Sequence, residues 1–357
     1  MRIADILDVK VRTGKAVRES STVEVNLREC SGLVERGLSD YGKDKETLRH
    51  RLETPRRWGP EVKKHYDLFY ERAEDIRERI KGNKSISPSP ILSDLYSIIN
   101  KGLIEDLYAY CMFAHEDRDD LLTHEIDVMC TSLMVGVGLK FDIKALLKVG
   151  LAGYLENVGM YRIPKGILEK REKLTKEDIS AIQAHPKEGY EILRALGNKY
   201  HWLAESALCV HERMDGSGYP YGRSGKEVPL LSYLIGLVDM YTAMIRERPY
   251  RRRIRKTDAV KYIVGGTKTL FPSSIRRAFL DRISLFPVGT YVKLNNGTIG
   301  CVILTNGNQA IRPTIQVLHN GAGRQPEGEE TLNLAENPLL YLTEEVSGSE
   351  PDPANLA

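Results

Sequence analysis

The chain has 357 residues, of which 41% are hydrophobic and 28% are charged, and its formal net charge is +3. These values are typical of an ordinary soluble protein, and so small a net charge implies no general affinity for nucleic acid or for a membrane. No apolar run is long enough to span a bilayer, and the first residues lack the apolar core of a signal peptide. Five scattered cysteines without a CxxC pair predict reduced core residues in a cytoplasmic protein: Cys30, Cys111, Cys130, Cys209 and Cys301.

Residues 1–83 are expected to form a separate, small N-terminal region of mixed structure and unknown role. Short alternating pieces such as Val23–Leu27 could each bury one face in a strand. From Asp40 to Lys81 the chain is highly charged with mixed signs, which is more typical of a solvated helical surface than of a binding patch. Residues 84–91 are rich in proline and serine, and they predict a linker.

Residues 92–285 are expected to form a helical domain. Within it, apolar residues recur at helical spacing and indicate one buried helix face: Ile126, Met129, Cys130, Leu133 and Met134. Thr175 followed by Asp178 is an acidic version of the capping box that begins a helix. The expected architecture is a helical bundle with its site between helices.

From residue 286 to residue 346 the pattern changes to a period of two, which predicts a small β module. The strands expected are Thr290–Leu294, Gly300–Leu304 and Thr314–Leu318, with Asn-Gly turn signals beside them. Residues 347–357 are expected to be a disordered tail. The predicted fold class is therefore mainly α, a helical-bundle domain with a small C-terminal β-barrel-like module and a small mixed N-terminal region.

Four polar residues lie on or near otherwise apolar helical segments, where a charge needs a partner: His124, His185, His211 and Asp239. Separations of roughly thirty to sixty residues can bring successive helices of a bundle past one centre. Imidazoles that share a carboxylate suit Fe, Mn, Ni or Zn. A single buried histidine is nevertheless more often a satisfied core residue than a ligand, so these four residues alone do not predict a metal site.

The run His211–Pro220 reads His-Glu-Arg-Met-Asp-Gly-Ser-Gly-Tyr-Pro, a combination that the packing of a hydrophobic core does not explain. It resembles the signature of the HD-GYP family, metal-dependent phosphodiesterases that open cyclic di-GMP. The resemblance extends from Asp120 to about Arg252. It implies an HD-type helical fold and, in some members, an extra acidic ligand at the position of Asp120. It also implies that the metal ligands are His124, His185, His211 and Asp239.

The chain departs from the family at residues that carry the chemistry. Glu156 and Asn157 stand in place of the His-Asp pair that names the family, and Met160 stands in place of a lysine. Val210 replaces the first of two paired histidines. In such a site the aspartate bridges two metals that activate a water, whereas the amide of Asn157 is neutral and cannot neutralise two dications. No catalytic residue is therefore assigned at this degenerate pair.

One metal could still be bound. Without a histidine at residue 210, a second metal would keep mainly His185 and His211. Glu156 could join His124 and Asp239 in a His/carboxylate site that is open to water. The expected cofactor is one divalent transition metal (Fe, Mn, Ni or Zn), or none.

By the same resemblance, Arg248 and Arg251 match basic residues that contact the dinucleotide, and Tyr219 matches a loop tyrosine beside it. Guanidinium groups bind phosphate through two parallel hydrogen bonds, and an aromatic ring offers a base a stacking face. The alternative is that the arginines form only a solvated basic loop. The glycine-rich loop is equally consistent with a structural turn and with a partner surface, which in the family includes contacts with diguanylate cyclase domains. Its residues are Gly216, Gly218, Tyr219 and Pro220.

Three functional hypotheses follow. The first is a degenerate HD-GYP protein, a cytoplasmic regulator or receptor that binds cyclic di-GMP, a related nucleotide or a protein partner and hydrolyses little or nothing. The second is an active metal-dependent cyclic di-GMP phosphodiesterase, a phosphoric diester hydrolase with an altered metal site, which the four retained anchors favour. The third is a structural scaffold. A homodimer is compatible with all three, whereas nucleic acid and membrane are not expected partners.

Overall fold

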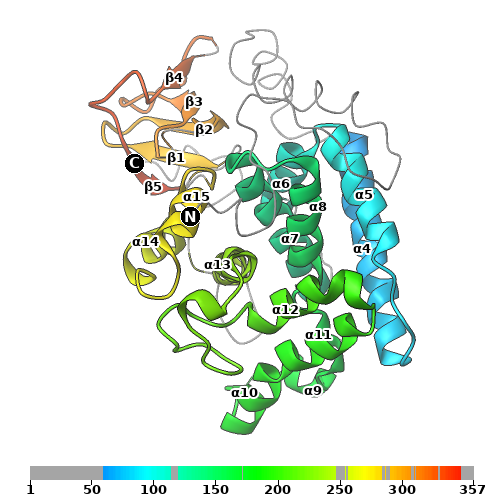
Figure 1. Ribbon diagram of the computed structural model, residues 1–357. Coiled ribbons are helices and arrows are strands. Elements are labelled where there is room, and N and C mark those ends of the chain that lie inside the picture. Colours follow the sequence, from blue (N-terminus) through cyan, green and yellow to red (C-terminus); the bar gives the residue numbers. More distant parts are fainter. Residues whose placement is uncertain are drawn as a thin grey trace, which may run out of the picture.

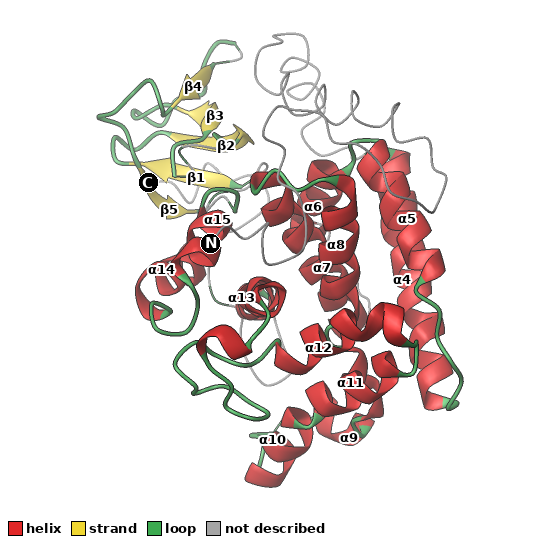
Figure 2. Cartoon of the chain, in the orientation of Figure 1, coloured by secondary structure: helices red, strands yellow, loops and turns green. Residues whose placement is uncertain are grey.

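The protein is described by a computed structural model over residues 59–113, 120–170, 172–246, 254, 256–283, 286, 290–306, 309, 311–328 and 330–346. Over these residues the chain is mainly helical, with a small sheet at one end of the helical body (Figures 1 and 2). The α-helices are α4 (Pro60–Lys81), α5 (Ser89–Asn100), α6 (Ile104–Phe113), α7 (Asp120–Gly138), α8 (Ile143–Leu155), α9 (Lys165–Leu168), α10 (Lys176–Gln183), α11 (His185–Arg194), α12 (His201–Cys209), α13 (Leu230–Ile245), α14 (Lys256–Gly266) and α15 (Ser273–Leu280). The 3₁₀ helices are η1 (Val158–Arg162), η2 (Asn198–Tyr200) and η3 (Gly225–Glu227).

Helix α7 lies at the centre of the helical body, where it packs against α4, α6, α8 and α13. The apolar face predicted from helical spacing is confirmed, because Ile126, Met129 and Leu133 are completely buried. The window Leu121–Gly138 is long and apolar enough by composition to cross a membrane, but 89% of it is buried inside the fold. Such extensive burial is typical of a helix in the core of a folded domain.

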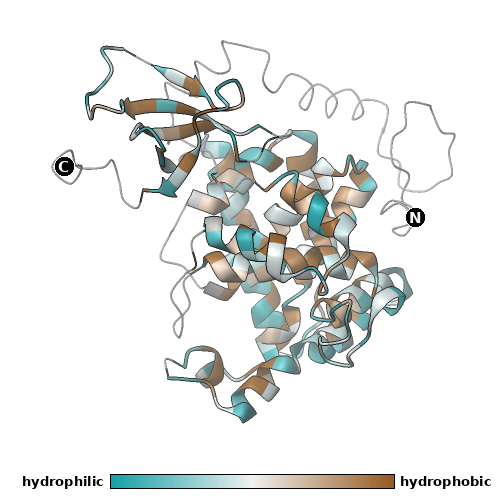
Figure 3. Cartoon of the chain, turned by 90° about the vertical axis from the view of Figure 1, so that its left-hand side faces the viewer, coloured by the Kyte–Doolittle hydropathy of each residue, from teal (hydrophilic) through white to brown (hydrophobic). Residues whose placement is uncertain are grey.

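Helix α4 contributes one face to the same hydrophobic core. Its charged residues form ion pairs at the surface, such as Arg79 with Asp75, which confirms the solvated helical surface expected for this part of the chain. Its other face buries Tyr66, Phe69 and Ala73 against the helices that follow. Figure 3 shows brown, hydrophobic residues and teal, hydrophilic residues interspersed along the helices of the body. The boundary expected near residue 83 remains a prediction, although the core is continuous across it.

Two helix starts carry side-chain caps, one of which the sequence analysis predicts. The side chain of Thr175 accepts a hydrogen bond from the Asp178 backbone, while the Asp178 carboxylate accepts one from the Thr175 backbone, so the predicted capping box is confirmed. Asp142 caps α8 by accepting a hydrogen bond from the backbone of Ala145 at 2.8 Å. These caps fix where α8 and α10 begin, and α8 leads directly into the candidate site.

The C-terminal module is a five-stranded antiparallel sheet in the order β4-β3-β2-β1-β5. It buries a small core of its own, which includes Val292, Val302 and Ile315. The three predicted strands are confirmed to within one residue at each end, and two further strands follow them. The strands are β1 (Tyr291–Leu294), β2 (Ile299–Leu304), β3 (Thr314–His319), β4 (Thr331–Asn333) and β5 (Leu342–Glu345).

Several predictions from the sequence fall outside the described residues. These include the mixed structure before residue 59, the tail 347–357, and the two phosphate-binding candidates Arg248 and Arg251. Asp120 is the first residue of α7, but its side chain is not described.

Candidate metal centre

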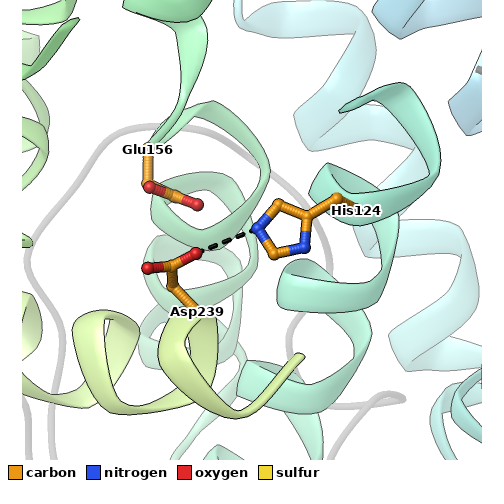
Figure 4. Close-up of side chains that lie close together, drawn as sticks. All are labelled: His124, Glu156 and Asp239. Atoms are coloured by element: carbon orange, nitrogen blue, oxygen red, sulfur yellow. Dashed lines mark hydrogen bonds and ion pairs between the residues drawn. The ribbon is translucent and has the colours of Figure 1, made fainter. Parts of the chain in front are cut away.

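The centre of the site is a contact between two buried helices. His124 on α7 and Asp239 on α13 meet with 2.9 Å between Nε2 and Oδ1, and the two residues are 3% and 7% exposed. Glu156, which directly follows α8, is 2% exposed and points toward the same place (Figure 4). One donor atom from each of the three residues lies within 4.8 Å of the others. The structure therefore brings one imidazole and two carboxylates from three helices to one buried point.

Two further histidines extend this centre. His211, just after α12, places its Nε2 3.0 Å from Nε2 of His185, the first residue of α11. The other ring nitrogen of His211, Nδ1, lies 3.8 Å from Oδ2 of Asp239. The Asp239 carboxylate thus lies between His124 and His211. All four polar anchors identified in the sequence are connected in this way.

The two additional histidines are held in their neutral form. Burial, and after it the neighbouring His185, lowers the pKa of His211 to about 3. Burial also lowers the pKa of His185, whose Nδ1 contacts the carbonyl oxygen of Ile182 at 2.7 Å. Because His185 donates from Nδ1, its Nε2 carries the lone pair that accepts a hydrogen bond from Nε2 of His211. The neutral imidazole is the form of histidine that binds metals.

The positions at which the chain departs from the HD-GYP pattern are all buried: Glu156, Asn157, Met160 and Val210. The side-chain amide of Asn157 donates a hydrogen bond to Oε1 of Glu156, and both residues are buried. Val210 is completely buried among apolar side chains, and Met160 is 8% exposed. Val210, next to His211, therefore has an apolar side chain that cannot bind a second metal.

The donor set at His124, Glu156 and Asp239 fits one divalent transition metal. Two carboxylates neutralise a dication, and a nitrogen with two oxygens suits Zn, Mn or Fe. The Nε2 atom of His124 would have to give up its contact with Asp239 to become a ligand. The donors fit a metal pair less well, because Asn157, where the resemblance predicts a bridging aspartate, carries a neutral amide. When bound, a metal would supply Lewis acidity and a more acidic bound water.

The loop expected to be a turn or a partner surface folds back over His211. The ring of Tyr219 stacks on the His211 ring with 4.7 Å between centroids and an angle of 12°. The backbone N–H of Tyr219 donates to the carbonyl of His211 at 3.3 Å. The buried carboxylate of Glu212 accepts a hydrogen bond from the backbone of Tyr221 at 2.9 Å. Tyr219 therefore covers one face of a candidate metal ligand, whatever else the loop contacts.

Two polar pairs with a buried carboxylate on α7 were not identified from the sequence. Tyr161 in η1 donates to Glu125 on α7, with 2.5 Å between the hydroxyl oxygen and Oε2. Arg246, after α13, donates to Asp127 on α7, with 2.5 Å between Nε and Oδ2. The available signal was the two acids within the apolar pattern of α7, because a buried charge requires a partner.

Comparison with known protein families finds one match in the helical part of the chain and one in its C-terminal part. Residues 110–275 match the HD domain, and residues 291–351 match the KOW domain associated with HD domain. The cyclic di-GMP phosphodiesterase PA4108 of Pseudomonas aeruginosa is 26% identical over 261 residues, which cover 72% of this chain and 62% of that protein. The 3'3'-cGAMP-specific phosphodiesterase 3 of Vibrio cholerae is 31% identical over 219 residues, or 60% of this chain and 45% of that protein. This chain thus spans less than two thirds of the length of each.

A solved structure also resembles the chain. It is Bd1817, a HDG"Y"P protein from Bdellovibrio bacteriovorus, with a TM-score of 0.44 and 16% sequence identity. The match covers 70% of this chain and 76% of that one.

Proposed function

Given that the chain belongs to the HD superfamily, we propose that it is a cytoplasmic cyclic-dinucleotide receptor that holds at most one divalent metal and hydrolyses little or none of its ligand. The ligand class comes from the relatives, whose names specify cyclic di-GMP or 3'3'-cGAMP. Cyclic di-GMP or a closely related dinucleotide is therefore the proposed ligand.

The observation that carries this proposal is the contact between Asn157 and Glu156. The Asn157 amide donates to the Glu156 carboxylate inside the protein, so the position that should bridge two metals is occupied by a neutral group already engaged with its neighbour. With Val210 completely buried beside His211, a second metal lacks two of its ligands. A two-metal activation of water is therefore not supported by these residues.

A second candidate function has its own support. The cluster of His124, Glu156 and Asp239 retains three donors at one buried point, and the neutral His185 and His211 adjoin it. A receptor without any metal has no need for such a donor set. The alternative is therefore a slow phosphodiesterase with a mononuclear site.

The test combines metal analysis with binding and turnover on the full chain. The protein is purified with Fe, Mn or Ni, analysed for metal per chain, and titrated calorimetrically with cyclic di-GMP and with 3'3'-cGAMP. Hydrolysis is followed by chromatography of the products. We expect no more than one metal per chain, saturable binding of one dinucleotide and no turnover. Two metals per chain with turnover would refute the proposal, and one metal with slow turnover would establish the mononuclear alternative.

A matched variant sharpens the comparison. Asn157→Asp combined with Val210→His restores the two family ligands, so the double variant should bind a second metal. If metal content and turnover stay at the wild-type level in this folded variant, the missing ligands are not the reason for inactivity. An absence of dinucleotide binding in both proteins would instead leave the scaffold hypothesis.

A further inference from the structure

The buried hydrogen bond between Tyr161 and Glu125 lies outside the donor set but next to it. The Tyr161 hydroxyl donates to the Glu125 carboxylate at 2.5 Å, and the two residues are 6% and 2% exposed. A hydroxyl that donates to a carboxylate away from water forms a strong and directional bond. It therefore defines how the two segments that carry these residues lie relative to each other.

Both segments carry a candidate metal ligand. Glu125 follows His124 on α7, so a contact with Glu125 is also a contact with the turn of helix that presents His124. Tyr161 belongs to η1, which begins directly after Glu156 and Asn157 at the end of α8. The hydrogen bond thus ties the turn that starts at Glu156 to the turn that presents His124.

A second contact holds η1 from its other side. At Gly159 an added Cβ would lie 2.0 Å from the carbonyl oxygen of His185 and 2.5 Å from the backbone nitrogen of Gly189. The backbone of η1 therefore lies directly against the first turn of α11, where His185 is located. With Gly159 against α11 and Tyr161 bonded to α7, η1 is fixed between two helices that both present site histidines.

We propose that Tyr161 is a positioning residue, which through Glu125 holds Glu156 at the separation from His124 and Asp239 that one metal ion requires. The inference rests on the proposed single metal and identifies a part of this chain that makes such a site possible. Phenylalanine at residue 161 would fill nearly the same volume, so packing alone does not need the hydroxyl. The hydroxyl adds direction, because it fixes the turn after Glu156 against one residue of α7. Residues that orient ligands in this way commonly change metal affinity by about 10-fold to 100-fold when they are replaced.

The test uses Co²⁺, because its visible absorption reports the geometry of its ligands and needs no enzymatic activity. The full chain is stripped with chelator, titrated with Co²⁺, and compared with Tyr161→Phe. We expect Tyr161→Phe to bind Co²⁺ about 10-fold more weakly or worse, with a shifted spectrum. Glu125→Gln keeps an acceptor for the hydroxyl and should retain most of the affinity.

Two further variants separate positioning from folding. Tyr154→Phe is the matched control, because the Tyr154 hydroxyl is also buried but donates to the carbonyl of Phe69 on α4. It should leave the Co²⁺ spectrum unchanged. The double variant Glu125→Leu with Tyr161→Phe removes both polar groups, so it should recover stability in urea with chelator present while its Co²⁺ affinity stays low.

The outcomes distinguish this inference from the proposed function. If the wild-type chain binds no Co²⁺, both the metal site and the positioning role are wrong. If the wild type binds Co²⁺ and Tyr161→Phe binds it with the same affinity and spectrum, only the positioning role is wrong. Equal losses of stability and affinity with an unchanged spectrum would also refute it, because that result describes a purely structural residue.

Discussion

Asn157 donates its side-chain hydrogen bond to Glu156, the residue immediately before it, and this buried contact joins the two positions at which the chain departs from the His-Asp pair that the HD-GYP resemblance implies. An amide next to a carboxylate is stable without a metal, whereas two adjacent carboxylates would repel each other. Glu156 and Asn157 therefore suit each other in a site that need not hold two cations.

The first prediction concerns Asn157→Asp. In the metal-free protein this change should lower the free energy of unfolding by roughly 1–3 kcal/mol, because it replaces a donor with a second buried acid. Added Mn²⁺ or Zn²⁺ should restore more stability in this variant than in the wild type. Urea denaturation with chelator and with metal measures both effects. Asn157→Ala is the control, since it loses the hydrogen bond without gaining charge; equal stability of the two variants would contradict the charge argument.

The second prediction concerns pH. Burial lowers the pKa of His211 to about 3 and also lowers that of His185, whereas an unfolded histidine titrates near 6.5. Below pH 6.5 the unfolded chain therefore binds more protons than the folded chain, so stability should fall as the pH falls from 6.5 toward 3. Each histidine contributes up to about 1.4 kcal/mol per pH unit.

Urea denaturation in chelator at pH 7.5, 6.5 and 5.5 measures this slope. In His211→Gln this slope should be smaller by about one proton. The same slope in His211→Gln as in the wild type would show that His211 does not remain neutral in the folded protein.

The sequence was sufficient to predict the main helices and the polar residues that meet at the candidate centre. His124 and Asp239 could be found because each is polar within an apolar helical pattern, and the fold places them in contact at 2.9 Å. Strands β1 and β3 could be found because buried and partly exposed residues alternate along them, and β2 because it is a short apolar run next to an Asn-Gly turn. Strands β4 and β5 could not, since they are short and contain no fully buried residue that would create an alternating pattern.

The polar pairs around the centre depend on packing that no local pattern reveals. Asp127 and Arg246 are 119 positions apart, and they meet only because α7 and α13 pack together. Likewise, the charged pattern of α4 correctly predicted a solvated face. The same pattern did not reveal that Tyr66 and Phe69, on the other face of α4, are buried.

The third prediction concerns the loop over His211. At Gly218 an added Cβ would lie 2.4 Å from the carbonyl oxygen of His211 and 2.5 Å from the backbone nitrogen of Arg213. Gly218→Ala must therefore displace the loop and separate Tyr219 from the His211 ring. We expect a loss of roughly 1–3 kcal/mol in the free energy of unfolding. Gly166→Ala, which has open space around the new methyl group, is the control and should lose nothing.

Metal titration extends this prediction. If Tyr219 holds the His211 ring in place, Gly218→Ala should also bind Co²⁺ more weakly than Gly166→Ala does. A displaced loop with unaltered Co²⁺ affinity would show that His211 does not need its aromatic cover.

The fourth prediction concerns the ion pair between Asp127 and Arg246. Asp127 is completely buried, and the Arg246 guanidinium also donates to the carbonyl of Cys111 at the end of α6. Asp127→Asn would leave a largely buried cation without its counter-charge, at a cost of about 3–5 kcal/mol. Asp127→Leu with Arg246→Met removes both charges and should recover most of that stability. By contrast, Asp75→Asn at the exposed pair with Arg79 should cost less than about 1 kcal/mol.

The same pair should also affect ligand binding, because the proposed phosphate-binding residues Arg248 and Arg251 follow Arg246 in the chain. On either side of the residues from 247 to 253, the backbone N–H of Ile254 donates to the carbonyl of Met244 at 2.9 Å. In the Asp127→Leu/Arg246→Met variant, where stability is recovered, calorimetry should therefore still show weaker cyclic di-GMP binding than in the wild type. Wild-type affinity in that variant would mean that the ion pair stabilises the helices and has no part in placing the arginines.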